Sequence, residues 1–142
     1  MKAQFEHEKL CVYQDALQFV TWVTPLLEAL PAELAARDRL DCSSTSNVLH
    51  LAEGYGKRSH ADRCRHFDLA RAAMFECAVS LGVLVAKKRL PAVEAARGKD
   101  QPVALVAMLA GLVSRFSGNF CDEQADYEAT SGTAHLVGQD ND

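Results

Sequence analysis

Glycine and proline are scarce in this chain, and the dipeptides that form tight hairpin turns are missing. Of its 142 residues, eight are glycine and four are proline, and neither Asn-Gly nor Asp-Gly occurs. Strands joined by short turns depend on such residues, so their scarcity argues against a β-sheet. Long stretches rich in alanine and leucine are present instead, and the sequence predicts an all-α protein.

A signal peptide, a membrane span and a C-x-x-C motif are missing as well. The longest apolar run, residues 72–86, has 15 residues and includes Glu76, whereas a spanning helix needs about 20. The first nine residues mix lysine with glutamate, unlike a signal peptide. An odd number of cysteines without paired spacing favours free thiols in a reducing compartment. These are Cys11, Cys42, Cys64, Cys77 and Cys121. We therefore expect a cytoplasmic protein that does not enter a membrane.

Negative charge is concentrated at the C-terminus. The formal net charge is -4, yet residues 1–121 carry 15 basic and 13 acidic residues, and residues 122–142 carry six acidic residues and no basic one. Residues 128–142 consist largely of small polar and acidic residues. Such a composition cannot bury a core, so we expect a folded domain over residues 1–127 and a disordered acidic tail over residues 128–142.

The hydrophobic pattern predicts four helices. Apolar residues recur every three or four positions over 5–30, 32–52 and 59–90, and Ser59 is a suitable N-cap for the third segment. Gly54 is expected to end the second helix, and Pro25 to kink the first. Asp100 and Pro102 are expected to begin a fourth helix that ends near residue 121 or 127. Short connections favour an up-down-up-down four-helix bundle.

Two of the expected helices are apolar on every side. Residues 72–86 contain Glu76 and Ser80 as their only clearly polar residues, and residues 102–113 contain no polar side chain. Four helices of this length do not supply enough neighbours to cover such helices all round. The sequence therefore predicts self-association, although alanine-rich faces exposed to water are an alternative.

Several motifs resemble one known family. They are FEHEKLCVYQDAL at 5–17, STS at 44–46, LAEGYGK at 51–57 and FDLARAAMFE at 67–76. These segments are similar to the four-helix-bundle proteins found in intervening sequences of bacterial 23S ribosomal RNA genes. The resemblance covers roughly residues 5–120, while His50 and Ala72-Ala73 depart from the usual Asn and Gly-Ser.

The resemblance implies more about assembly than about activity. Similar proteins form cytosolic up-down bundles that assemble as ring-shaped homopentamers, and most have no established activity. A related branch, the accessory proteins of diversity-generating retroelements, binds nucleic acid and a reverse transcriptase. We therefore expect this chain to form a ring-like homo-oligomer, a pentamer, with RNA or a protein as its further partner.

A basic turn follows the second expected helix. Its candidate nucleic-acid-binding residues are Lys57, Arg58, Arg63 and Arg65. Repeated around a ring, this patch would attract a phosphate backbone. A basic helix face that is only solvated is the alternative interpretation.

Charged residues in apolar surroundings should be paired. A hairpin that turns near residue 56 would place Arg71 opposite Asp41 and Glu76 opposite Arg37, and Glu53 would brace the turn. We interpret these residues as structural, although a ligand site or an enzyme active site around Glu53, His50 and Arg71 between subunits is an alternative.

Chemical motifs of enzymes and metal centres are missing. No P-loop and no Glu-x-x-His occurs, His50-x-x-Glu53 has the reverse order, and His60 with Cys64 supplies only two ligands. The sequence thus predicts a non-enzymatic scaffold or adaptor without metal or cofactor, which contacts RNA or a nucleic-acid-associated protein through the basic turn.

Overall fold

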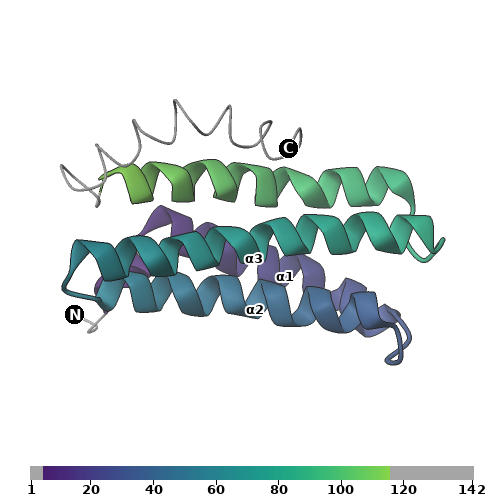
Figure 1. The fold of residues 1–142 in the computed structure, drawn as a ribbon. Helices are drawn as coiled ribbons and strands as arrows, with labels where there is room; N and C mark the ends of the chain where they lie inside the picture. Colours follow the sequence, from purple (N-terminus) through teal and green to yellow (C-terminus); the bar gives the residue numbers. More distant parts are fainter. Residues whose placement is uncertain (1–4, 116–142) are drawn as a thin grey trace, which may run out of the picture.

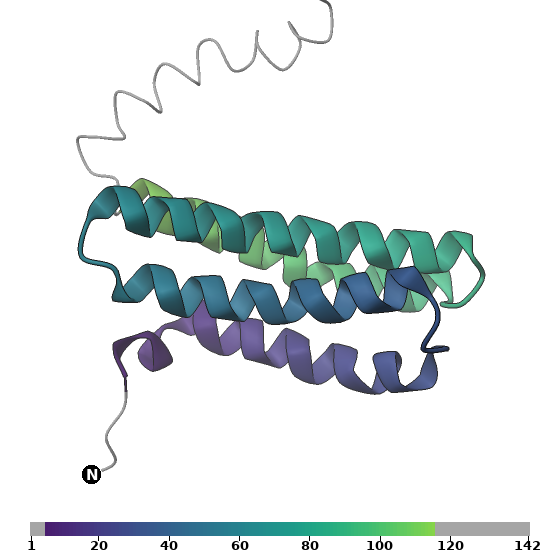
Figure 2. The ribbon, with the colours of Figure 1, turned by 60° about the horizontal axis from the view of Figure 1, so that its bottom comes forward.

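The computed structural model describes residues 5–115, which form an all-helical bundle. A short 3₁₀ helix, η1 (Glu6–Lys9), precedes α1 (Cys11–Ala29), α2 (Ala35–Gly56) and α3 (His60–Ala86). A fourth helix covers residues 92–115. The helices lie side by side and successive helices run in opposite directions (Figures 1 and 2). The structure confirms the all-α class and is consistent with the predicted four-helix bundle, and the predicted tail lies outside the described residues.

The first two helices begin later than predicted, and Gly54 does not end α2. Leu10 is extended, with φ -77° and ψ 133°, and separates η1 from α1. Pro25 lies inside α1, which continues to Ala29. The α2 helix runs through Gly54 to Gly56. A Cβ atom on Gly54 would lie 2.8 Å from Phe67 Cε1, so this glycine provides close approach between α2 and α3 and not a helix end.

One predicted helix start is confirmed and another is wrong. Ser59 caps α3, because its side chain accepts a hydrogen bond from the Asp62 amide at 3.0 Å. The fourth helix begins directly after Pro91, whose carbonyl accepts the amides of Glu94 and Ala95, about ten residues before the predicted start. Pro102 therefore lies inside the helix, where it removes a backbone donor. Its buried ring packs in the core.

The core lies along the α2–α3 hairpin and is closed by α1 and the fourth helix. Its largest buried side chains include Leu40 and Leu51 of α2, Phe67 and Met74 of α3, and Phe19 of α1. One amide joins them, because Asn47, fully buried in α2, donates from Nδ2 to the Ala70 carbonyl of α3 at 2.8 Å. This bond fixes the two helices relative to each other.

An apolar stripe remains exposed on α3. It contains Phe75, Val79 and Val83, which recur every four residues, together with Leu69, and Phe75 and Val79 are 53% and 65% exposed. A shallow groove beside Phe75 continues to Val103 on the fourth helix. A single bundle thus leaves one side of α3 uncovered over this stretch, in line with its apolar sequence pattern.

The α3 helix is long and apolar enough to cross a membrane. Core helices of soluble proteins can be equally long and apolar, and α3 packs its Phe67 and Met74 side into the bundle core. This property is weak evidence for a membrane, and the expected cytoplasmic location stays a prediction.

Candidate functional site

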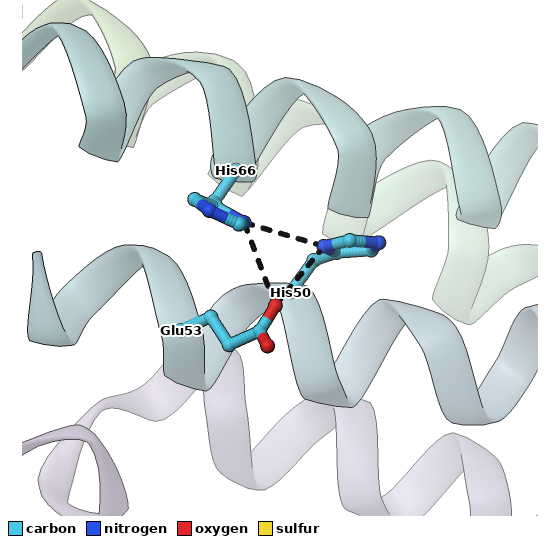
Figure 3. A group of neighbouring side chains, drawn as sticks. All are labelled: His50, Glu53 and His66. Atoms are coloured by element: carbon cyan, nitrogen blue, oxygen red, sulfur yellow. Dashed lines mark hydrogen bonds and ion pairs between the residues drawn. The ribbon is translucent and has the colours of Figure 1, made fainter.

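Two histidines and a glutamate meet near the closed end of the α2–α3 hairpin. His50 and Glu53 are three residues apart on α2, so their side chains leave the same face of the helix. His66 lies in the second turn of α3 and points toward them (Figure 3). The three side chains form the His50–Glu53–His66 cluster, which combines ligand types that transition metals bind.

The three facing atoms are almost equally spaced. His50 Nδ1 lies 3.4 Å from His66 Nδ1, and Glu53 Oε1 lies 3.4 Å from His50 Nδ1 and 3.5 Å from His66 Nδ1. Ordinary N–H···O hydrogen bonds cluster near 2.9 Å, so these separations are long for direct bonds. One nitrogen or oxygen from each residue thus lies within 3.5 Å of the other two.

The site is accessible from one side. The Glu53 side chain is 55% exposed, whereas that of His66 is only 11% exposed. Desolvation lowers the pKa of His66, and Arg65, Lys57 and His50 lower it further, while Glu53 opposes the shift. His66 is therefore predominantly neutral at pH 7, the form in which imidazole binds metals.

Within one chain, His66 is the residue that joins His50 and Glu53. The sequence hypothesis placed a site around Glu53, His50 and Arg71 between subunits. Within one chain, Arg71 forms an ion pair with Asp68, at 3.7 Å, on its own helix. His66 was not singled out as a ligand from the sequence. The sequence would have paired His66 with His50 if the turn had been centred on residue 58, the middle of the hairpin in the structure, because the two histidines lie equally far from it.

The predicted ion pairs Arg71–Asp41 and Glu76–Arg37 are wrong. Glu76 instead accepts a hydrogen bond from Ser43 at 2.6 Å, and Arg37 donates to the Leu27 carbonyl at 2.9 Å. The reason is register: α2 continues to Gly56 and α3 starts at His60. The turn is therefore centred about two residues later than predicted, and facing positions shift by several residues.

The basic turn is partly committed to structure. Arg63 donates from Nε to the Lys57 carbonyl at 2.6 Å, and its guanidinium lies 5.4 Å from the centre of the Tyr55 ring. Arg65 lies 3.9 Å from Asp62 with its side chain 63% exposed, and Arg58 is exposed. Of the four predicted nucleic-acid-binding residues, Arg58 and Arg65 are thus the most accessible.

The pair His60 and Cys64 does not form a second ligand group. Cys64 is buried and its thiol donates to the Val113 carbonyl of the fourth helix at 3.7 Å, whereas His60 is exposed. Within residues 5–115, the only group of three potential ligands is the His50–Glu53–His66 cluster.

Comparison with known proteins identifies a family and a fold. The model of the 23S rRNA-intervening sequence protein family matches residues 8–111. A crystal structure of a protein of unknown function from the S23 ribosomal protein family of Bacteroides thetaiotaomicron is similar, with a TM-score of 0.68 and 17% identity. The match covers 72% of this chain and 97% of that protein. No curated protein matches the chain.

Proposed function

Because the chain belongs to the 23S rRNA-intervening sequence protein family, we propose that it is a non-enzymatic scaffold built from several copies. The proposed assembly is a ring of five chains, the arrangement that the family resemblance implies. Its proposed role is to hold RNA, or a protein associated with RNA, at the basic turn.

The observation that carries self-association is the apolar stripe on α3. When a large apolar side chain that is partly exposed in the single chain is covered by another copy, its burial stabilises the assembly by about 1–2 kcal/mol. Phe75, Val79 and Val83 recur every four residues along one side of α3, with Leu69 exposed nearer its start, and the shallow groove next to Phe75 has a volume of about 180 Å³. A second copy of the chain is the occupant that we propose, because a row of this length is costly in a monomer.

The experiment compares two matched valines by light scattering after size-exclusion chromatography. Val79 in the stripe and Val93 on the fourth helix are 65% and 71% exposed. A Val79→Glu substitution is expected to reduce the mass from about five chains to one, because it would bury a charge in the interface. Val93→Glu should leave the mass unchanged. A monomeric unsubstituted protein, or equal masses for both variants, would contradict the proposal.

RNA binding has its own test at the basic turn. Replacing Lys57, Arg58 and Arg65 by alanine removes three positive charges beside the hairpin, and replacing Lys87, Arg89 and Arg97 removes three from exposed positions elsewhere. Retention of RNA on a filter at low salt should fall with the first variant only. It should also weaken with rising salt in the unsubstituted protein, because bound counterions are released from the phosphates. Equal retention by both variants would reject the basic turn as the RNA-binding surface.

A further inference from the structure

The spacing of the His50–Glu53–His66 cluster matches the ligand spacing of a tetrahedral metal ion. Zinc bonds to histidine nitrogen and carboxylate oxygen are about 2.1 Å long, and a regular tetrahedron with such bonds has ligand atoms about 3.4 Å apart. The separations in the cluster are 3.4, 3.4 and 3.5 Å. An ion about 2.1 Å from all three atoms would leave one tetrahedral position open.

Hydrogen bonding alone explains this arrangement less well. Both histidines could carry a proton on Nδ1 and donate it to Glu53, but the separations of 3.4 and 3.5 Å exceed the usual N–H···O distance of about 2.9 Å. The two Nδ1 atoms and Glu53 Oε1 lie at the corners of a nearly equilateral triangle (Figure 3), which is the spacing that a central cation requires. We propose that His50, Glu53 and His66 bind one Zn²⁺ per chain.

The open position determines what else could bind there. One carboxylate leaves a net positive charge on the Zn²⁺ site, and Lys57 and Arg65 lie close enough to act electrostatically on His66. The fourth ligand is therefore water, hydroxide or another small anion. The exposed side of Glu53 gives such a ligand access from solvent. The ion would join α2 to α3 next to the basic turn.

The test uses the full chain without an affinity tag, stripped of metal by a chelator. Titration with Zn²⁺ is expected to give one ion per chain, and Co²⁺ as a probe is expected to produce the visible absorption of a tetrahedral site. Loss of a group that merely supports a ligand weakens metal binding about 10–100-fold. Loss of a ligand itself, in His66→Ala or Glu53→Gln, should therefore weaken Zn²⁺ binding at least about 100-fold.

The controls separate ligation from folding. His60→Ala removes an exposed histidine from the same helix, outside the cluster, and should leave the Zn²⁺ affinity unchanged. Glu53→Gln keeps the size of a side chain that is 55% exposed, so circular dichroism should show unchanged helix content. The cysteines are the same in every variant and cannot account for a difference.

Two results would overturn the proposal. One is that Glu53→Gln binds Zn²⁺ as tightly as the unsubstituted chain, and the other is that His60→Ala weakens binding as much as His66→Ala. The mass of the metal-free protein in solution tests self-association separately, because the exposed stripe on α3 lies outside the cluster. Failure of the scaffold proposal and failure of the metal proposal can thus be distinguished.

Discussion

Gly54 and Gly56 allow the closeness of the α2–α3 contact to be measured directly. A Cβ atom at position 54 would lie 2.8 Å from Phe67 Cε1 and 3.0 Å from His66 Cβ, whereas a Cβ atom at position 56 would meet nothing within 4 Å. Both glycines lie in α2, so alanine at either position gains helix propensity, at most about 1 kcal/mol. The two variants should therefore differ in stability only by the cost of the steric clash at position 54.

Overpacking a filled site costs about 1–3 kcal/mol. Gly54→Ala should consequently be less stable than Gly56→Ala by about 1–3 kcal/mol, while Gly56→Ala should equal or slightly exceed the unsubstituted protein. Urea unfolding followed by far-UV circular dichroism measures both free energies. If Gly54→Ala proved as stable as Gly56→Ala, the close approach of α2 to Phe67 and His66 would be refuted.

Two further predictions concern buried polar groups. Asn47→Ala should lower the free energy of unfolding by about 1–3 kcal/mol, because it removes the buried hydrogen bond to the Ala70 carbonyl. Urea unfolding measures this loss of stability. A similar loss from Thr45→Ala, at an exposed position of the same helix, would contradict the prediction. Burial and the adjacent Glu76 raise the pKa of the Cys77 thiol from 9.0 to about 12. At pH 8, the reactive thiolate of Cys77 should therefore be about 1,000-fold rarer than that of a thiol with the ordinary pKa of 9.0. In iodoacetamide labelling read by mass spectrometry, exposed Cys42 should be modified long before buried Cys77, and the labelling of Cys77 should rise as pH increases. Equal labelling rates for Cys42 and Cys77 would refute the burial of Cys77.

Membership in the family and the all-helical class were both predictable from the sequence. Helical periodicity and the Ser59 cap depend on neighbours within one turn, and such local signals can be recognised along the chain. The apolar surroundings of Phe75 and Val79 likewise predicted a helix with an uncovered side, which the exposed stripe on α3 matches.

Gly54 and Pro102 lie inside helices and not at the predicted helix ends, because the effect of a glycine or proline depends on what packs against it. Gly54 resembles a helix end in sequence, yet it lies within α2 where Phe67 leaves no room for a side chain. Pro102 resembles a helix start, yet its buried ring lies in the core, and packing there outweighs one missing backbone donor.

The pairing of residues across the hairpin was decided by tertiary structure alone. The sequence by itself determined the presence of four helical segments, the apolar side of α3 and the family, because these depend on local spacing and composition. A shift of about two residues in the turn changes every partner across two antiparallel helices. That register places His66, and not Arg71, beside His50 and Glu53. It depends on packing such as that of Gly54 on Phe67 and Asn47 on Ala70, contacts between residues that are far apart in the chain.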